Sequence, residues 1–307
     1  MKRMMLPSSR TFEQKTNFDG FPKPGEFIEM TGTHTLEASD RAIFNVLYKI
    51  AHESGRLLDP MAEWQVAYSV LREAFSAHES NERLRASLLR LKDVKVNIHY
   101  IEDGEPRVIY TELFDFLDIP KKKTNKRQML RFGFARKVVP VLEQSGKWGR
   151  IRLEIVCAMT SKYAIALHEL VQLRANLDRC VESFSIERFR DLLGVPPGKY
   201  ERVDNLMRKV IEPAVIQVNG LSDMGVAIEA RRRHSRAPVH EFALTWWCKQ
   251  GEEYRAAVQE RNRPKVGRMA RLKGLVEQVE TGQAVLVNEE VSEKLRTRSA
   301  RNLRRSR

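Results

Sequence analysis

Cysteine is scarce in this sequence, and its spacing fits no covalent or metal framework. The three cysteines, Cys157, Cys180 and Cys248, are odd in number, lie far apart and form no CxxC pair. Neither a disulfide scaffold nor a structural zinc site has that pattern. We therefore expect three reduced thiols with structural roles, and no bound metal.

Long apolar runs are also missing. The apolar stretch 155–159 stops at three polar residues, far short of the roughly 18 consecutive apolar residues of a membrane-spanning helix. The run Met4-Met5-Leu6 near the start is too short for the core of a signal peptide. These absences predict a soluble, cytoplasmic protein with no membrane partner.

The chain lacks the short motifs of several enzyme classes. It has no GxxxxGK[ST] loop for a nucleotide, and its seven histidines never form the HxH pair of metal-dependent DNA-nicking enzymes. His168 falls on the inward side of a predicted helix, where packing is its expected role. We predict no catalytic residue, no cofactor and no enzymatic activity.

Negative charge is under-represented, and this imbalance indicates the kind of partner. The 307 residues include 54 Lys and Arg against 40 Asp and Glu, a formal net charge of +14. Such a chain attracts densely negative partners, nucleic acid first and an anionic membrane surface second. A chain of this length with 42% hydrophobic residues can form two domains of on the order of 100–150 residues each.

The first half of the chain has the periodicity of three helices followed by a hairpin. Residues 1–30 show no apolar periodicity and are expected to be a flexible arm. The later segments switch from helical spacing to period-two alternation, which is the order of a winged helix. The predicted elements are helices beginning near Ser39, over about 61–77 and after residue 80, and strands over 94–100 and 107–113 joined by an Asp103-Gly104 turn.

The second half repeats that order of elements. A helix is predicted over 162–177, and a shorter one begins after Ser185 and ends at Gly194. Residues 200–214 carry the clearest amphipathic pattern in the chain. Pro213 is expected to kink that helix rather than end it.

A second predicted hairpin completes the repeat. Residues 224–228 and 242–246 alternate in period two and are joined by the loop 230–238. The sequence therefore predicts an α+β fold with two tandem winged-helix (helix-turn-helix) domains. The expected boundaries are 1–30 for a flexible N-terminal arm, 31–155 for the first domain, 156–250 for the second domain and 251–307 for a basic C-terminal tail.

A winged helix binds duplex DNA by placing its third helix in the major groove, while its hairpin reaches neighbouring phosphates. In the second domain, the outward side of that helix offers guanidinium, amide and ammonium groups suited to base edges and phosphates. The hairpin loop is rich in arginine, whose charges repel one another unless an anion is near. The predicted DNA-binding residues are Arg83, Arg85 and Arg90 in the first domain, and Lys199, Arg202, Asn205, Arg208, Lys209, Arg231, Arg232, Arg233 and Arg236 in the second.

Each basic set has an alternative role. The outward helix face can be a solvated surface laced with Glu-to-Arg pairs, and the arginine-rich loop can serve solubility alone. The arginines of the first domain can cover apolar surface with their stems. The run 121–127 is either a phosphate contact or a linker, and residues 292–307 are expected to order only against phosphate.

Three linked segments resemble those of plasmid initiator replication proteins. Residues 159–170, MTSKYAIALHEL, are similar to that family's SKYAxxLYELL segment. Residues 189–195, FRDLLGV, then Tyr200 and then residues 208–219, RKVIEPAVIQVN, resemble its next motifs in the same order. The resemblance is looser in the first domain and spans about residues 30–250.

The departures from the family pattern are few. His168 stands where Tyr is usual, and Gln217 and Val218 stand where Glu and Ile are usual. These positions lie in packing or helix-end regions of the predicted fold. They leave the resemblance intact.

The resemblance implies a non-enzymatic replication initiator. Members of this family bind direct repeats, called iterons, in double-stranded origin DNA, promote origin opening, and recruit the host replication initiator and replicative helicase. A homodimer, with much of its interface in the first domain, represses the initiator's own gene. The alternative is a winged-helix transcriptional regulator that shares the fold but starts no replication.

Overall fold

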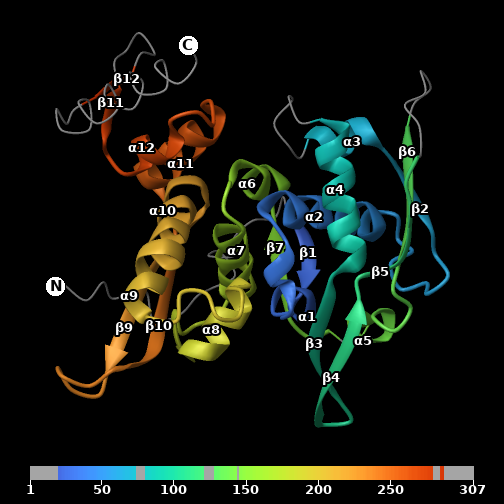
Figure 1. Cartoon of the computed structure of the whole chain (residues 1–307), viewed down its shortest axis with the longest axis horizontal. Coiled ribbons are helices and arrows are strands. Elements are labelled where there is room, and N and C mark those ends of the chain that lie inside the picture. The colour runs from blue at the N-terminus through green and yellow to red at the C-terminus, as the bar shows by residue number, and fades with distance from the viewer. Residues whose placement is uncertain (1–19, 74–79, 121–127, 144, 279–283, 287–307) are drawn as a thin grey trace, which may run out of the picture.

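The structure is a computed structural model that describes residues 20–73, 80–120, 128–143, 145–278 and 284–286. It forms two halves that lie side by side, with helix α7 (Lys162–Arg174) between them (Figure 1). The predicted loop 121–127 and the basic segment 292–307 lie outside the described residues.

The first half contains three helices and a hairpin in winged-helix order, together with two further short α-helices and two small sheets. The hairpin β3–β4 is antiparallel, β1 pairs with β7, and a further sheet has the order β2-β6-β5. The elements are β1 (Phe21–Pro24), α1 (Gly25–Ile28), η2 (Thr33–Thr35), α2 (Ala38–Glu53), β2 (Trp64–Ala67), α3 (Tyr68–Glu73), α4 (Asn81–Asp93), β3 (Lys95–Glu102), β4 (Glu105–Glu112), β5 (Phe114–Asp118), β6 (Met129–Phe134), α5 (Val139–Glu143) and β7 (Trp148–Ile151).

The second half repeats the winged-helix order, and its sheet has the order β8-β10-β9. Two further helices follow the hairpin. After α7 the elements are β8 (Val181–Ser185), α8 (Ile186–Leu193), α9 (Val203–Leu206), the π-helical turn η3 (Met207–Ile211), α10 (Glu212–Leu221), β9 (Met224–Arg232), β10 (Val239–Cys248), α11 (Gly251–Asn262), α12 (Arg268–Leu272), β11 (Val276–Gln278) and β12 (Ala284–Leu286), while α6 (Leu153–Ala158) leads into α7. The predicted pair of winged-helix domains is confirmed.

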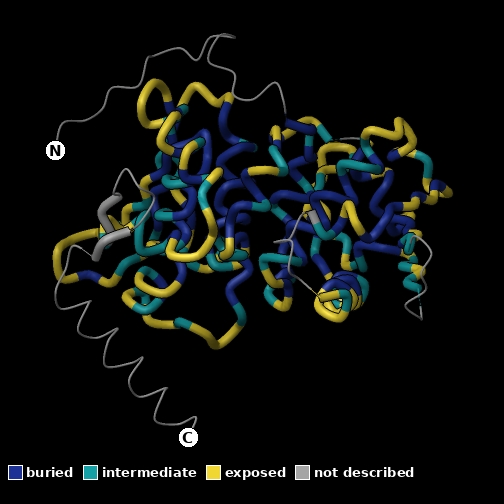
Figure 2. Tube along the Cα trace, turned by 90° about the horizontal axis from the view of Figure 1, so that it is seen from above, coloured by how far each residue is buried: buried dark blue, intermediate teal, exposed yellow. Residues whose placement is uncertain are grey.

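Apolar side chains fill the interior of both halves, and the exposed segments lie at the outer loops (Figure 2). In the first domain, the ring of Phe134 packs against Phe27, Phe44 and Trp64, which come from three separate elements. These rings bring α1 and α2 onto the β2-β6-β5 sheet. The core therefore fixes the scaffold from which α4 and the β3–β4 hairpin extend.

Helix α7 packs on both domains at once. Ten of its 13 residues are buried. On one side, Glu169 Oε1 accepts hydrogen bonds from Lys23 Nζ at 2.8 Å and Asn45 Nδ2 at 2.6 Å. On the other, Gln172 donates to Asp223 Oδ1 at 2.7 Å. Helix α7 therefore packs against the cores of both domains. The expected domain boundary at residue 155 falls inside α6, just before α7.

Three segments differ from the sequence-based expectation. Residues 64–67, expected to be helical, form strand β2, because Trp64 and Val66 alternate with exposed Gln65 and pair with β6. Part of the expected N-terminal arm is ordered as β1 and α1, and Lys23 of β1 is 1% exposed. Part of the expected tail forms α11 and α12.

The two C-terminal helices are anchored by arginines. Arg268 is 4% exposed and donates to the carbonyl of Ala158, which lies 110 residues away, at 2.8 Å. Glu260 accepts from Arg271 at 2.6 Å, and Arg261 donates to the Leu221 carbonyl at 2.7 Å. Residues 251–272 are therefore a packed part of the second half.

Candidate nucleic-acid interface

The turn that leads into the third helix of the second domain is held by side-chain and backbone contacts. Ser185 caps α8 by accepting from the Arg188 amide at 3.1 Å, and Gly194 ends it in the left-handed region at φ 71°. Arg190 then donates to the carbonyls of Lys199 and Tyr200. Because Arg190 ties these two carbonyls to α8, the start of α9 is fixed relative to the domain.

The third helix runs through α9, η3 and α10 without a break. Leu206, Val210 and Ala214 are buried against the domain. The π-helical turn comes directly before Pro213, whose missing N–H leaves a carbonyl of the preceding turn without its usual helical partner. As expected, Pro213 does not end the helix, and the structure has a wider turn just before it.

The opposite side of this helix carries the predicted contact residues. Arg202, Arg208 and Lys209 are exposed, and Asn205 is half-buried. Arg208 Nη2 donates to Asn205 Oδ1 at 3.3 Å, so the guanidinium and amide are adjacent. Such a pair matches the hydrogen-bonding edges of guanine and adenine in the major groove. Lys199 is exposed in the turn just before the helix.

The arginines of the second hairpin fall into two groups. Arg231 lies within 3.4 Å of Glu241 and 3.8 Å of Glu229, and Arg232 donates to the carbonyl of Ala237 at 2.8 Å. The mutual repulsion expected from the sequence is therefore partly neutralised within the hairpin itself. Within the described chain, Arg233 and Arg236 are exposed without a hydrogen-bond or ion-pair partner.

In the first domain, α4 presents two exposed arginines and one that has a structural role. Arg83 and Arg85 are exposed, and Arg85 donates to the Pro120 carbonyl at 3.4 Å. The Arg90 guanidinium instead contacts Asp40 at 2.7 Å and Glu37 at 3.2 Å. The hydrogen bond to Asp40 is the main cause of a raised Arg90 pKa. The side chain predicted to contact DNA thus ties α4 to the start of α2.

The hairpin of the first domain has an acidic tip. Glu102, Asp103 and Glu105 surround the turn, and Arg107 is paired with Glu102 at 2.9 Å. A tip of this charge repels phosphate. This hairpin tip is therefore not expected to contact phosphate, unlike the exposed Arg83 and Arg85 of α4.

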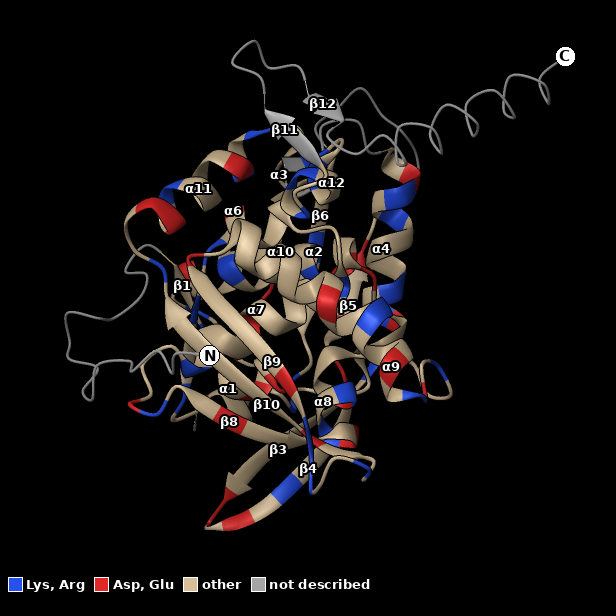
Figure 3. Cartoon of the chain, turned by 90° about the vertical axis from the view of Figure 1, so that its left-hand side faces the viewer, with Lys and Arg blue, Asp and Glu red and all other residues tan. Residues whose placement is uncertain are grey.

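Helix α4 and the α9–η3 segment, which both carry exposed basic residues, lie along the same edge of the molecule (Figure 3). A duplex placed along that edge meets both helices. Neither Arg190 nor Lys162, which lies between the two faces, was singled out from the sequence as a site residue. The only sequence signal for either was its place inside a motif that resembles the initiator family.

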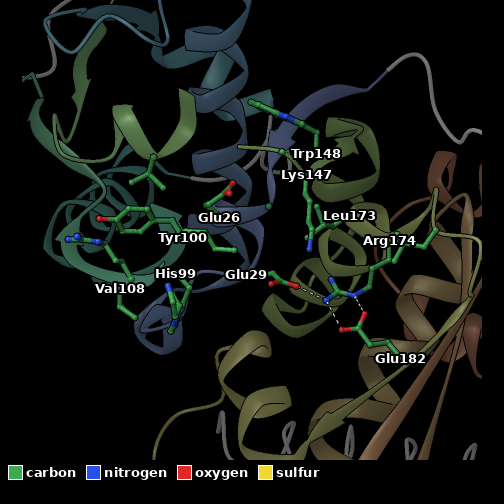
Figure 4. A pocket seen from close by; sticks show the side chains of 17 residues that line it. Glu26, Glu29, His99, Tyr100, Val108, Lys147, Trp148, Leu173, Arg174 and Glu182 are labelled. Atoms are coloured by element: carbon green, nitrogen blue, oxygen red, sulfur yellow. Dashed lines mark hydrogen bonds and ion pairs between the residues drawn. The ribbon is translucent and has the colours of Figure 1, made fainter. Parts of the chain in front are cut away.

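A concavity lies at the domain junction, on the side of the β3–β4 hairpin. Its volume is about 730 Å³, and Tyr100 and Val108 face Arg174 across it (Figure 4). Arg174 bridges Glu29 of the first domain, at 2.5 Å, and Glu182 of the second, at 2.6 Å. These contacts link the domains through paired charges.

His168 has a packing role in this structure. It is fully buried, and its Nδ1 lies 3.0 Å from Ser222 Oγ. Burial lowers its pKa from the ordinary value. In the part of the chain that the structure describes, no group of three or more His, Cys, Asp or Glu side chains is placed to hold a metal ion. Among the same residues, no helix is both long and apolar enough to cross a membrane.

Comparison with known families gives one match for each half. Residues 23–172 match the family model described as "Initiator Replication protein, WH1", and residues 185–246 match "Initiator Rep protein, WH2". The first match includes all but the last two residues of α7 and begins inside the expected N-terminal arm. Residues beyond 246, with α11 and α12, lie outside both matches.

Several solved structures match this chain, to different extents. The Pi initiator protein in complex with iteron DNA is 12% identical, with a TM-score of 0.58, over 78% of this chain and 99% of that one. Domains 2 and 3 of RctB are 9% identical, with a TM-score of 0.43, over 69% of this chain and 82% of that one. The comparison with curated proteins gave no match.

Proposed function

Because this chain belongs to the initiator replication protein family, with a match to each of its two winged-helix domains, we propose that it initiates plasmid replication by binding direct repeats in origin double-stranded DNA. The observation that carries the proposal is that the two helices with exposed basic residues lie along one edge of the molecule (Figure 3). Two third helices on one edge can enter successive major grooves, roughly one helical turn or 34 Å apart.

The proposed contacts divide by domain. In the second domain, Arg202, Asn205 and Arg208 read base edges, while Lys199, Lys209 and the hairpin arginines Arg231, Arg232, Arg233 and Arg236 contact phosphates. In the first domain, Arg83 and Arg85 contact the backbone. Arg90 acts indirectly, because its guanidinium is held by Asp40. The similar Pi initiator protein was solved with iteron DNA, which supports this choice of ligand.

The proposal has further parts. On binding, the protein promotes origin opening and recruits the host replication initiator and replicative helicase. As a homodimer it represses its own gene. We assign the chain no catalytic step and place its action in the cytoplasm.

The test is binding of purified protein to the DNA flanking its own gene, with scrambled DNA as control, across a range of salt. Repeat-dependent binding in stepwise complexes is expected, one step for each loaded monomer. Equal binding to both DNAs, with a steep salt dependence, would mean that the charge alone attracts DNA and would overturn the proposal. Binding to an operator without loss of plasmid maintenance on gene deletion would indicate a transcriptional regulator.

A further inference from the structure

A shallow cleft lies where the two domains meet, next to the third helix of the second domain. Its volume is about 530 Å³, and we call it the junction cleft. The start of α2 contributes Glu37, Ala38 and Ser39, the start of α7 contributes Ser161 and Lys162, and η3 contributes Lys209. The cleft therefore exists only while the two domains keep this arrangement.

Two ammonium groups from different elements line the junction cleft. Lys162 Nζ donates to the backbone carbonyl of His34 at 2.5 Å and lies 5.3 Å from the Tyr163 ring centroid. Lys209 is exposed. Among the described residues, neither ammonium is in an ion pair, whereas the lining carboxylate of Glu37 is held by Arg90 at 3.2 Å. The positive charge of the cleft is thus available to a ligand.

The surroundings of Lys162 favour a bound anion. Burial and the nearby Arg41 lower the pKa of Lys162 to about 8, while Glu37 and Asp40 act in the opposite direction. An anion beside the ammonium would offset the cost of burial and the repulsion from Arg41. The backbone N–H groups of Thr160 and Ser161 already donate to Gln217 Oε1, so the lysines and not the helix start would hold the anion.

We propose that the junction cleft binds a backbone phosphate of the duplex between the two recognition helices, with Lys162 and Lys209 as its cationic contacts. This inference rests on the proposed function, since it requires duplex DNA along the shared basic edge. A backbone that leaves one major groove must pass the middle of that edge before the next groove. A phosphate bound at the junction contacts both domains, so the strength of this contact depends on how the two domains are oriented relative to each other.

Two variants change the charge of the cleft, and two control variants accompany them. Lys162→Gln removes one contact and should weaken binding to repeat DNA about five- to tenfold, with a salt slope smaller by about one. Ala38→Glu adds a repelling charge at the first turn of α2 and should weaken binding more than the neutral substitution at the same position. Ala38→Gln is the neutral control for size. Lys49→Gln, at the other end of α2, is the control for net charge; both controls should bind like wild type.

Chemically modified DNA, tested together with these variants, identifies which phosphate is bound. Single methylphosphonate substitutions along the repeat duplex each remove one backbone charge. One position should weaken binding of the wild type but have little further effect on Lys162→Gln, because the contact is already lost. Lys162→Gln could be less stable than wild type. In that case the question is decided by the DNA affinity of Ala38→Glu and by methylphosphonate scans of wild type and of Ala38→Glu, compared position by position.

The outcomes separate this inference from the proposed function. If the wild type shows no preference for repeat DNA, the proposed function is wrong, and so is the phosphate site that rests on it. If the wild type prefers repeats while Lys162→Gln and Ala38→Glu bind as tightly as it does, only the phosphate site at the junction is overturned.

Discussion

Arg90 and Arg208 lie on the third helix of their respective domains, but their guanidinium groups have different surroundings. Asp40, the partner of Arg90, is fully buried, so removal of Arg90 leaves a buried carboxylate without its cation. Arg208 is exposed and touches only Asn205 among the described residues. Alanine substitution should therefore affect stability at Arg90 and DNA binding at Arg208.

We expect Arg90→Ala to lower the free energy of unfolding by about 1–3 kcal/mol, from the loss of charge-assisted hydrogen bonds to Asp40. Arg208→Ala should leave that free energy unchanged and weaken repeat-specific binding by about 1–3 kcal/mol. Urea denaturation and fluorescence anisotropy measure the two quantities. Normal repeat binding by both Arg208→Ala and Lys209→Ala would show that this helix does not read the DNA.

His168 makes stability depend on pH. Burial holds its folded-state pKa below the ordinary 6.5, so the unfolded chain takes up a proton first as the pH falls. Stability from this group is present above pH 6.5 and is lost below it, by up to about 1.4 kcal/mol per pH unit until the folded-state pKa is reached. His168→Gln should show a smaller loss between pH 7 and pH 5.5 in urea midpoints. The same loss in both proteins would assign it to other groups.

At the scale of elements, local signals were sufficient where a single feature determines the structure. The Ser185 cap, the Gly194 stop and the alternation of the two hairpins were predicted correctly. Strand β2 was missed because its four residues are too few to reveal period-two alternation inside a longer segment that was expected to be helical. Its partner β6 lies more than 60 residues away. The role of Arg90 was also not predictable, because it depends on a buried carboxylate of another helix.

The C-terminal helices were missed for a related reason. Their charged composition suggests a solvated tail, whereas Arg268 and Glu260 are buried and form an ion pair at 3.5 Å, and Arg268 also donates to the distant carbonyl of Ala158. No apolar stripe in the sequence indicates that kind of packing.

Helices α11 and α12 should therefore contribute to folding. A chain that ends at residue 250 loses the Arg268 contact to Ala158 and the Arg261 contact to Leu221, and we expect it to be less stable by about 3 kcal/mol or more. A chain that ends at residue 275 keeps both contacts and serves as the control. Thermal denaturation compares them, and equal midpoints would show that the two helices add nothing to the fold.

At the scale of the whole molecule, the buried pair Lys23 and Glu169 joins the N-terminal strand to α7; each side chain is 1% exposed. Glu169→Ala leaves the Lys23 ammonium buried without a counter-charge, which should cost about 3–5 kcal/mol. Because α7 also packs on the second domain, this loss should reach both domains. Hydrogen exchange is expected to rise together in α2 and in the β9–β10 hairpin. A rise confined to α2 would contradict shared stability.

The shared helix also constrains how such a protein can evolve by recombination. A crossover near residue 175 would join a resident α7 to an incoming second domain, whose Ser222 and Asp223 positions would have to suit His168 and Gln172. A crossover upstream of α7 would bring a foreign Glu169 position to the resident Lys23 and Asn45. Either exchange breaks one set of contacts unless both sides match, so the two DNA-binding domains should be inherited as a pair.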